Sequence, residues 1–229
     1  IMNFKTDLPL VCIQGLGFVG SAMAVAVAGA LTKTDNQPLF NVCGIDLPNK
    51  LGKERIKDLN QGIFPFETVD EHLKTSLKNI VKKGNLKATY SEEAYQKADF
   101  IIVDIPLDID LNNRLNSESV NFEPFKKAIQ TFAKLMKEDC LVIIETTVPP
   151  GTSQNVVYPI IEAEFKKRNL NRENILLAHS YERVMPGANY LDSIINFWRV
   201  YSGLNKKSSA ICKKFLERII NTIDYPLRE

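Results

Sequence analysis

The fold is decided by residues 9–20, which read PLVCIQGLGFVG. An apolar run that stops at a glycine is typical of a buried strand, and we expect one over residues 9–14. Small and apolar residues then continue through residues 18–30, as in a closely packed helix. The GxGxxG spacing therefore lies between a strand and a helix, which is the setting in which such a loop binds the pyrophosphate of a dinucleotide.

Each glycine of this loop has its own expected role. Gly15 permits the tight turn, Gly17 lets a pyrophosphate approach the backbone, and Gly20 lets the helix pack closely on the strand. The helix start at Phe18 and Val19 offers unpaired N–H groups and the positive end of the helix dipole. We therefore expect all five residues to contact a cofactor.

A second apolar run, residues 39–46, ends at Asp46. We expect its carboxylate to accept hydrogen bonds from the adenosine ribose and to repel a 2′-phosphate, which favours NAD over NADP. Asp46 lies 26 residues after Gly20, more than the usual spacing, and the polar loop at residues 32–38 accounts for the excess. The alternative is a tight turn followed by an incidental surface Asp.

Strand-like and helix-like segments alternate along the rest of the chain. Further strand candidates are residues 100–106 and 140–148, and weaker ones are residues 175–179 and 199–202. Helical candidates are a short segment capped by Ser91 and residues 123–138, 152–167 and 206–223. This alternation predicts an α/β fold with a doubly wound, mostly parallel, Rossmann-like sheet. The chain shows no repeat or flexible linker, so we expect one domain over residues 1–229.

Composition excludes several classes of function. The 229 residues carry a net charge of +2, which gives no electrostatic basis for binding nucleic acid or an anionic membrane. No apolar run reaches the roughly 18 residues of a spanning helix, and the first residues lack the pattern of a signal peptide. We expect a cytoplasmic protein without a nucleic-acid or membrane partner.

The cysteines and histidines give no sign of a metal site. The sequence contains no CxxC pair, and its histidines have no second ligand at metal spacing. These residues are Cys12, Cys43, Cys140, Cys212, His72 and His179. We expect buried free thiols in a reducing compartment and no bound metal.

Two further polar segments follow strand candidates. Residues 145–152 read ETTVPPGT, and residues 180–187 read SYERVMPG. Because ligands of open α/β sheets sit beyond the carboxyl ends of the strands, we expect Thr147, Glu182 and Arg183 in the cofactor crevice. A carboxylate there suits general-base chemistry. The alternatives are an ion pair of Glu182 with Arg183 or a helix cap, and backbone capping by Thr147.

The ordered segments GLGFVG, GID, ETTVPPGT and SYERVMPG resemble the UDP-glucose/GDP-mannose dehydrogenase family. The ERVMPG form is most similar to the branch that oxidises UDP-N-acetylhexosamines. The resemblance implies a four-electron oxidation of a nucleotide sugar, in which the C6 alcohol becomes an aldehyde and then a carboxylate with two NAD+. It implies an active-site cysteine that holds the aldehyde as a thiohemiacetal. Thr147 would then hydrogen-bond the reacting water or hydroxyl, Glu182 would assist hydrolysis as general base, and Arg183 would reach a substrate group.

The chain departs from the family pattern in several places, among them Tyr181, which replaces a usual proline. The GGxCxPxD segment that carries the nucleophilic cysteine is absent, as are the lysine and asparagine of the following helix. Where relatives read Val-Pro-Thr-Pro, Pro106 is followed by Leu107, which has no hydroxyl, so we expect the cofactor contact from Pro106 or the backbone. Asp104 lies within an apolar run and needs a partner if it is buried.

We therefore expect the NAD-binding portion of a nucleotide-sugar dehydrogenase, which binds NAD but turns over no sugar by itself. The full-length protein would be a homodimer. Two alternatives stay open: a stand-alone NAD-binding module without catalysis, and another member of the β-hydroxyacid dehydrogenase superfamily.

Overall fold

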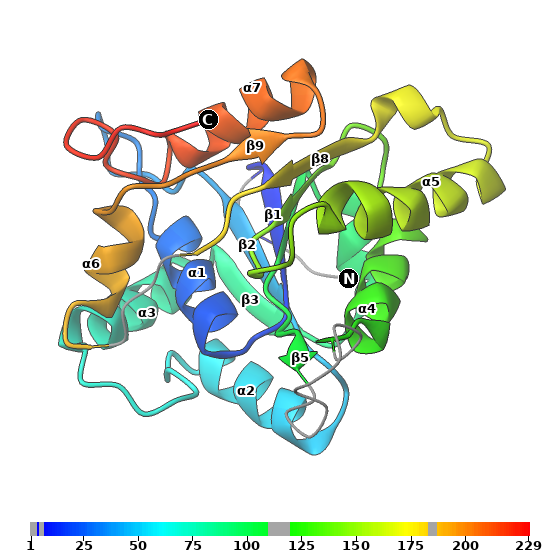
Figure 1. Cartoon of the computed structure of the whole chain (residues 1–229). Helices are drawn as coiled ribbons and strands as arrows, with labels where there is room; N and C mark the ends of the chain where they lie inside the picture. Colours follow the sequence, from blue (N-terminus) through cyan, green and yellow to red (C-terminus); the bar gives the residue numbers. More distant parts are fainter. Residues whose placement is uncertain (1–3, 5–6, 110–119, 183–186) are drawn as a thin grey trace.

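A computed structural model describes residue 4 and residues 7–109, 120–182 and 187–229. Seven strands form one sheet in the order β3-β2-β1-β4-β7-β8-β9 (Figure 1). Their bounds are β1 (Leu10–Gln14), β2 (Asn41–Ile45), β3 (Leu86–Thr89), β4 (Phe100–Val103), β7 (Leu141–Ile144), β8 (Leu176–His179) and β9 (Ser202–Gly203). All neighbours pair in parallel except β9, which is antiparallel to β8. The predicted mostly parallel, doubly wound, Rossmann-like sheet is confirmed.

Helices cover both faces of this sheet (Figure 1). One face carries α1 (Phe18–Ala28), α2 (Lys50–Asn60), α3 (Glu71–Lys83), α6 (Tyr190–Ile195) and α7 (Lys206–Leu216). The other face carries the 3₁₀ helix η1 (Glu92–Lys97), α4 (Glu123–Ala133) and α5 (Tyr158–Lys167). A short two-stranded ribbon pairs β5 (Asp108–Ile109) with β6 (Val120–Asn121), and η4 (Arg172–Asn174) precedes β8.

The strands are apolar throughout because both of their faces are buried. In β1, Val11 and Ile13 pack against α1 and its neighbours, whereas Cys12 between them packs on the side of α4 and α5. The same alternation recurs in β7, where Ile143 and Ile144 point to opposite faces. The period of two thus divides each strand between two hydrophobic cores.

Several predicted elements differ from the observed ones at their ends. The helix expected over residues 152–167 begins as the π-helical turn η3 (Ser153–Val157) and becomes α-helical only at Tyr158. Pro159 lies at the start of α5 and has no N–H for the regular hydrogen-bond pattern, which favours this irregular turn. The segment after Ser91 is a 3₁₀ helix, and the Ser91 side chain makes no capping hydrogen bond. The strand expected over residues 199–202 pairs with β8 only from Ser202.

Helices α2, α3 and α6 and strand β3 were not predicted as elements. Helix α3 carries clear signals at both ends, since the Asp70 carboxylate accepts from the Leu73 N–H at 2.9 Å and Gly84 closes the helix with a φ of 83°. Asn49 caps α2 in the same way, accepting from the Gly52 N–H at 2.8 Å. These caps fix the two helices that lie between β2 and β3 in the chain.

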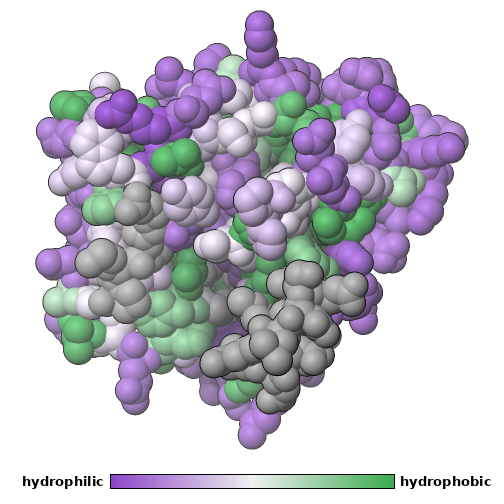
Figure 2. Space-filling model, in the orientation of Figure 1, coloured by the Kyte–Doolittle hydropathy of each residue, from purple (hydrophilic) through white to green (hydrophobic). Residues whose placement is uncertain are grey.

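The face drawn in Figure 2 is mainly hydrophilic, and its hydrophobic residues form small separate groups. Single exposed apolar residues are normal on a protein surface. Within the ranges that the structure describes, no helix is both long enough and apolar enough to cross a membrane.

Candidate functional site

The glycine loop joins β1 to α1 at the carboxyl edge of the sheet. Gly15 has a φ of +96°, and a Cβ there would lie 2.6 Å from the Asp104 carbonyl oxygen. A Cβ on Gly20 would lie 2.0 Å from the Gly15 carbonyl oxygen. Both positions therefore require glycine, the first for its backbone conformation and both for close packing.

Gly17 differs from the other two glycines because its missing side chain faces open space. A Cβ there would meet no atom within 4 Å. Gly17 is also the N-cap of α1, no side chain caps the helix, and its first turn contains no acidic residue. The N–H groups at the start of α1, including those of Phe18 and Val19, are therefore left for an anionic ligand, which fits a pyrophosphate.

The Phe18 side chain is held away from such a ligand by other aromatic rings. Its ring packs edge-on against Tyr190 at 4.7 Å, Phe64 at 5.5 Å and Phe66 at 5.6 Å between centroids. These contacts tie α1 to α6 and to the segment that follows α2. The expected contribution of Phe18 to cofactor binding is thus restricted to its backbone.

Asp46 follows β2 and lies beside the loop, as Gly15 N–H donates to the Ile45 carbonyl at 2.9 Å. Its carboxylate accepts from the Leu47 N–H at 2.8 Å and pairs with Arg55 of α2 at 3.3 Å. The Arg55 guanidinium also lies over the Phe66 ring, 5.2 Å from its centroid. No pattern in the sequence predicted Arg55 as a residue of this region.

Large apolar side chains stand exposed next to Asp46. Leu47 directly follows it and is 62% exposed. Tyr90, which is 56% exposed, follows β3, whose last residue, Thr89, accepts from the Asp46 N–H at 3.2 Å. An acid beside exposed apolar groups suits an adenosine, because the ribose is polar and the base is flat and apolar.

The two threonines after β7 have different roles. The Thr146 hydroxyl accepts from the Ile105 N–H at 3.0 Å and donates to the Ile105 carbonyl at 2.8 Å, so it joins the ends of β4 and β7. Thr147 is exposed, and its side chain makes no hydrogen bond within the part of the chain that the structure describes. The capping role considered for Thr147 thus belongs to Thr146, and the Thr147 hydroxyl is left for a ligand.

After β4, Pro106 is exposed, whereas Leu107 packs against the core between the sheet and α4. The Leu107 side chain therefore serves packing. Pro106 stays available as a cofactor neighbour.

Glu182 lies in a buried cluster of three acids and one guanidinium, which we call the acidic cluster: Asp104, Glu145, Glu182 and Arg199. Arg199 Nη1 lies 2.9 Å from Glu145 Oε1, and its Nη2 pairs with Glu182 Oε2. The side chains of Arg199, Glu145 and Glu182 are only 3%, 2% and 7% exposed. Glu182 therefore has an ion-pair partner in Arg199, and the alternative pair with Arg183 falls outside the described residues.

Asp104 completes the cluster beside Glu145, and no ion pair of its carboxyl group occurs among the described residues. Burial raises the pKa of the Asp104 carboxyl well above its ordinary value, and the negative charge and hydrogen bond of Glu145 raise it further. The Tyr190 hydroxyl is buried nearby, and its pKa is raised by burial and by the charges of Glu182 and Asp104. Arg183 lies outside the described residues, so its expected contact with substrate stays a prediction.

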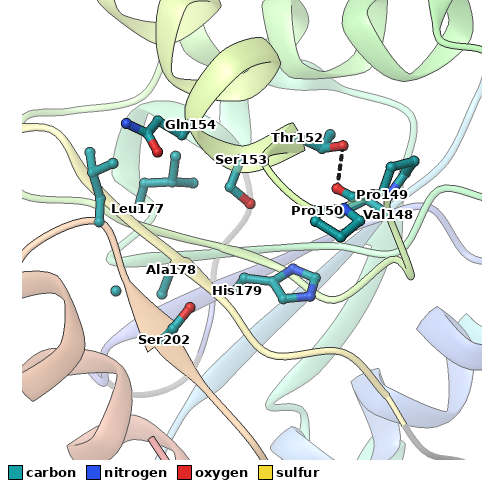
Figure 3. A pocket seen from close by; sticks show the side chains of 13 residues that line it. Val148, Pro149, Pro150, Thr152, Ser153, Gln154, Leu177, Ala178, His179 and Ser202 are labelled. Atoms are coloured by element: carbon teal, nitrogen blue, oxygen red, sulfur yellow. Dashed lines mark hydrogen bonds between the residues drawn. The ribbon is translucent and has the colours of Figure 1, made fainter.

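A separate pocket of roughly 330 Å³ lies between η3 and the β8–β9 edge of the sheet (Figure 3). Ser153 and Gln154 line its η3 side, and Ala178, His179 and Ser202 line the opposite side (Figure 3). Burial lowers the pKa of His179, so its imidazole is neutral at pH 7. Val148 lines this pocket and directly follows Thr147 in the chain, so the pocket adjoins the candidate site.

None of the four cysteines offers a reactive thiol. All four are free and buried, and burial raises the pKa of the Cys12, Cys140 and Cys212 thiols, that of Cys212 to about 12. A thiol of raised pKa is a poor nucleophile at neutral pH. Among the described residues, no group of three or more His, Cys, Asp or Glu side chains is arranged to hold a metal ion.

The structure thus brings most of the predicted site residues to one edge of the sheet. The glycine loop, Asp46, Pro106, Thr147 and Glu182 all follow the carboxyl ends of parallel strands. Arg199 was not predicted as a site residue because it lies in a weak strand candidate, 17 residues after Glu182 and 54 after Glu145. Asp104 in an apolar run and Glu182 after a strand were the signals of the acidic cluster in the sequence.

Comparison with known proteins identifies the group to which this arrangement belongs. Residues 9–223 match the model of the UDP-glucose/GDP-mannose dehydrogenase family, NAD binding domain. The chain is 30% identical over 215 residues to the UDP-N-acetyl-D-mannosamine dehydrogenase of Methanocaldococcus jannaschii, with 92% of this chain and 42% of that protein covered. It is 29% identical over 177 residues to the UDP-N-acetyl-D-glucosamine 6-dehydrogenase of Pseudomonas aeruginosa, which covers 77% of this chain and 36% of that protein.

Solved structures share the fold. The NDP-N-acetyl-D-galactosaminuronic acid dehydrogenase of Methanosarcina mazei superposes with a TM-score of 0.84 at 23% identity, over 98% of this chain and 44% of that one. The chain spans less than half the length of the curated relatives named above. The match over residues 9–223 shows that the chain belongs to the UDP-glucose/GDP-mannose dehydrogenase family and holds its NAD binding domain.

Proposed function

We propose that this chain is the cofactor-binding part of an enzyme that oxidises the C6 alcohol of a UDP-N-acetylhexosamine to the uronic acid with two NAD+. Relatives named for UDP-N-acetylmannosamine and UDP-N-acetylglucosamine support this substrate class. The observation that carries the cofactor assignment is the open space at Gly17 in front of the uncapped start of α1. We assign residues 1–229 to this one domain.

Each part of the site has a proposed role toward the cofactor. The N–H groups at the start of α1 hold the pyrophosphate, and Asp46 holds the adenosine ribose. Pro106 and Thr147 lie along the crevice toward the reacting end. When bound, the nicotinamide ring accepts a hydride from the substrate carbon.

Thr147 and Glu182 are the proposed catalytic residues. The exposed Thr147 hydroxyl orients a reacting water or hydroxyl by hydrogen bonding. Glu182 accepts a proton as general base, directly or through water, and Arg183 contacts a substrate group. The chain by itself supplies no nucleophilic thiol among its four cysteines, so we expect it to bind NAD without turning over a sugar.

We further propose that the whole protein is a homodimer of the reducing cytoplasm. The four free thiols agree with a reducing compartment.

Titration of the isolated chain with NADH, followed by cofactor fluorescence, tests the cofactor assignment. Gly17→Asp should fold, because the position is open and Asp is a good N-cap. Its carboxylate would occupy the anion site, so NADH affinity should fall at least about tenfold, equivalent to about 1.4 kcal/mol.

Asn205→Asp is the matched control, since Asn205 caps α7 by accepting from the Ser208 N–H at 2.8 Å. It places the same charge at a helix N-terminus away from the loop and should leave NADH binding unchanged. Absence of binding by the unmodified chain at millimolar NADH would refute the assignment. NADH production from UDP-N-acetylmannosamine by the chain alone would contradict its expected inactivity.

A further inference from the structure

Among the residues that the structure describes, the acidic cluster holds more carboxyl groups than guanidinium groups. Asp104, Glu145 and Glu182 carry three carboxyl groups, and Arg199 carries one guanidinium. Asp104, Glu145 and Arg199 are at most 8% exposed, and the side chain of Glu182 is 7% exposed. An unpaired buried charge costs several kcal/mol of desolvation, and a group in that position takes up a proton instead.

The contacts point to Asp104 as the carboxyl that would hold a proton. Glu145 and Glu182 each contact one nitrogen of Arg199, whereas no ion pair of Asp104 occurs within the described ranges. Asp104 Oδ2 and Glu145 Oε2 are both buried and lack a hydrogen-bond donor there. One proton on Asp104 supplies that donor, and the two side chains are close enough for a hydrogen bond.

The other groups around Asp104 do not remove this requirement. The backbone of Gly15 and Gly20 packs directly against Asp104 and brings no charge. Tyr190 of α6 contributes a hydroxyl that is neutral at pH 7, since burial raises its pKa. Arg199 attracts the charged form of Asp104, but this attraction is outweighed by burial and by the two glutamates.

We propose that Asp104 is a neutral acid at pH 7 that donates a hydrogen bond to Glu145, and that Asp104, Glu145 and Arg199 are positioning residues for Glu182. Glu145 holds Nη1 of Arg199, so that Nη2 is directed onto Glu182. Glu182 is thereby kept in one orientation as a carboxylate, the form that a base requires. The catalytic role of Glu182 rests on the proposed function, but the position of the proton does not.

Asp104 also links this network to the cofactor loop. Asp104 follows β4, and its carbonyl oxygen packs so closely on the loop that a Cβ on Gly15 would lie only 2.6 Å from it. A change at Asp104 would therefore act on the loop and on Glu182 together. The neutral form avoids a fixed negative charge beside the site proposed for the pyrophosphate.

Infrared spectroscopy of the chain in heavy water at pH 7 tests for the proton. A protonated carboxyl group absorbs above the amide I band, where a carboxylate does not. We expect this band in the unmodified chain and its loss in Asp104→Asn, which keeps the shape and a donor toward Glu145. Asp99→Asn is the control, since Asp99 precedes β4 at its other end and pairs with Lys137 at 2.6 Å. It should leave the band unchanged, and a spectrum without the band in the unmodified chain would overturn the proposal.

The positioning role has its own readout in the ¹³C resonance of the Glu182 carboxyl group, identified by its loss in Glu182→Gln. Glu145→Gln should move this resonance, because Arg199 is then no longer shared between two carboxylates. Arg199→Lys, which keeps the positive charge, should move it less than Arg199→Gln. Asp99→Asn should not move it. An unmoved resonance in both Glu145→Gln and Arg199→Gln would refute positioning. NADH titration of the unmodified chain is independent of both measurements. A failure of the proposed function would therefore be distinguishable from a failure of the inference about Asp104 and Glu182.

Discussion

Asp46 and Arg55 meet at the end of the candidate site proposed for the adenosine, with 3.3 Å between carboxylate oxygen and guanidinium nitrogen. In Asp46→Ser the carboxylate that repels a 2′-phosphate is gone, and Arg55 is released to pair with that phosphate. We predict that the preference for NADH over NADPH falls at least about tenfold, or about 1.4 kcal/mol. Titration with both cofactors measures it. If the double variant Asp46→Ser/Arg55→Ala kept the gain in NADPH affinity, Arg55 would have no part in it.

Asp104 makes the stability of the chain depend on pH. The pKa of Asp104 is raised well above 3.8 in the folded chain. At pH values between 3.8 and the folded pKa, the unfolded chain therefore binds fewer protons than the folded chain. The stability contributed by Asp104 is complete below the unfolded pKa and is lost as pH rises.

The side chain introduced by Asp104→Asn does not titrate, so this variant does not lose stability from position 104 as the pH rises. Its stability relative to the unmodified chain should therefore rise by about 1.4 kcal/mol for each pH unit within the window. Urea unfolding at several pH values between about 5 and 8 measures the difference. A difference that stayed constant with pH would show that Asp104 has the same charge in the folded and unfolded chains.

At the scale of elements, Asp70 joins two helices that are far apart in the chain. One of its carboxylate oxygens accepts from the Leu73 N–H of α3 at 2.9 Å, and the other accepts from the Leu191 N–H of α6 at 2.8 Å. Asp70 is fully buried. Asp70→Ala leaves two buried donors unpaired and should lower the free energy of unfolding by about 2–4 kcal/mol.

Asp70→Asn keeps one acceptor and should cost less than Asp70→Ala, as urea unfolding of both variants would show. Asn49→Ala removes a more exposed cap from α2 and serves for comparison, with an expected loss near 1 kcal/mol. Equal stability of Asp70→Ala and the unmodified chain would mean that water satisfies both N–H groups.

Local sequence patterns predicted the sheet and the glycine loop because strands buried on both faces are continuous apolar runs, and β1 and β7 are such runs. They did not predict α2 and α3, whose caps, Asn49 and Asp70, mark their starts only once the neighbouring strands are known. They found Glu182 by its place after a strand but not its partner, Arg199. An ion pair between residues so distant in sequence depends on sheet order, which no short pattern contains.

At the scale of the whole molecule, the sheet divides the interior into two apolar layers, and cysteines lie in both. Cys12 and Cys43 are opposite each other in the paired strands β1 and β2, while Cys140 precedes β7 and Cys212 lies in α7. All four are buried in the cores that the helices close over the sheet. Their access to solvent therefore depends on opening of the fold as a whole.

This burial predicts that the native chain at neutral pH does not react with a water-soluble thiol reagent such as dithiobis(nitrobenzoate), whereas the denatured chain releases four equivalents. In dilute urea the four thiols should become reactive together, at a rate that follows global unfolding, because each is buried in one of the two cores that close over the same sheet. Asp70→Ala should speed this reaction in proportion to its lost stability, and Asp99→Asn should not. Rapid reaction of a single cysteine in the native chain would show a local opening and would restore a candidate nucleophile.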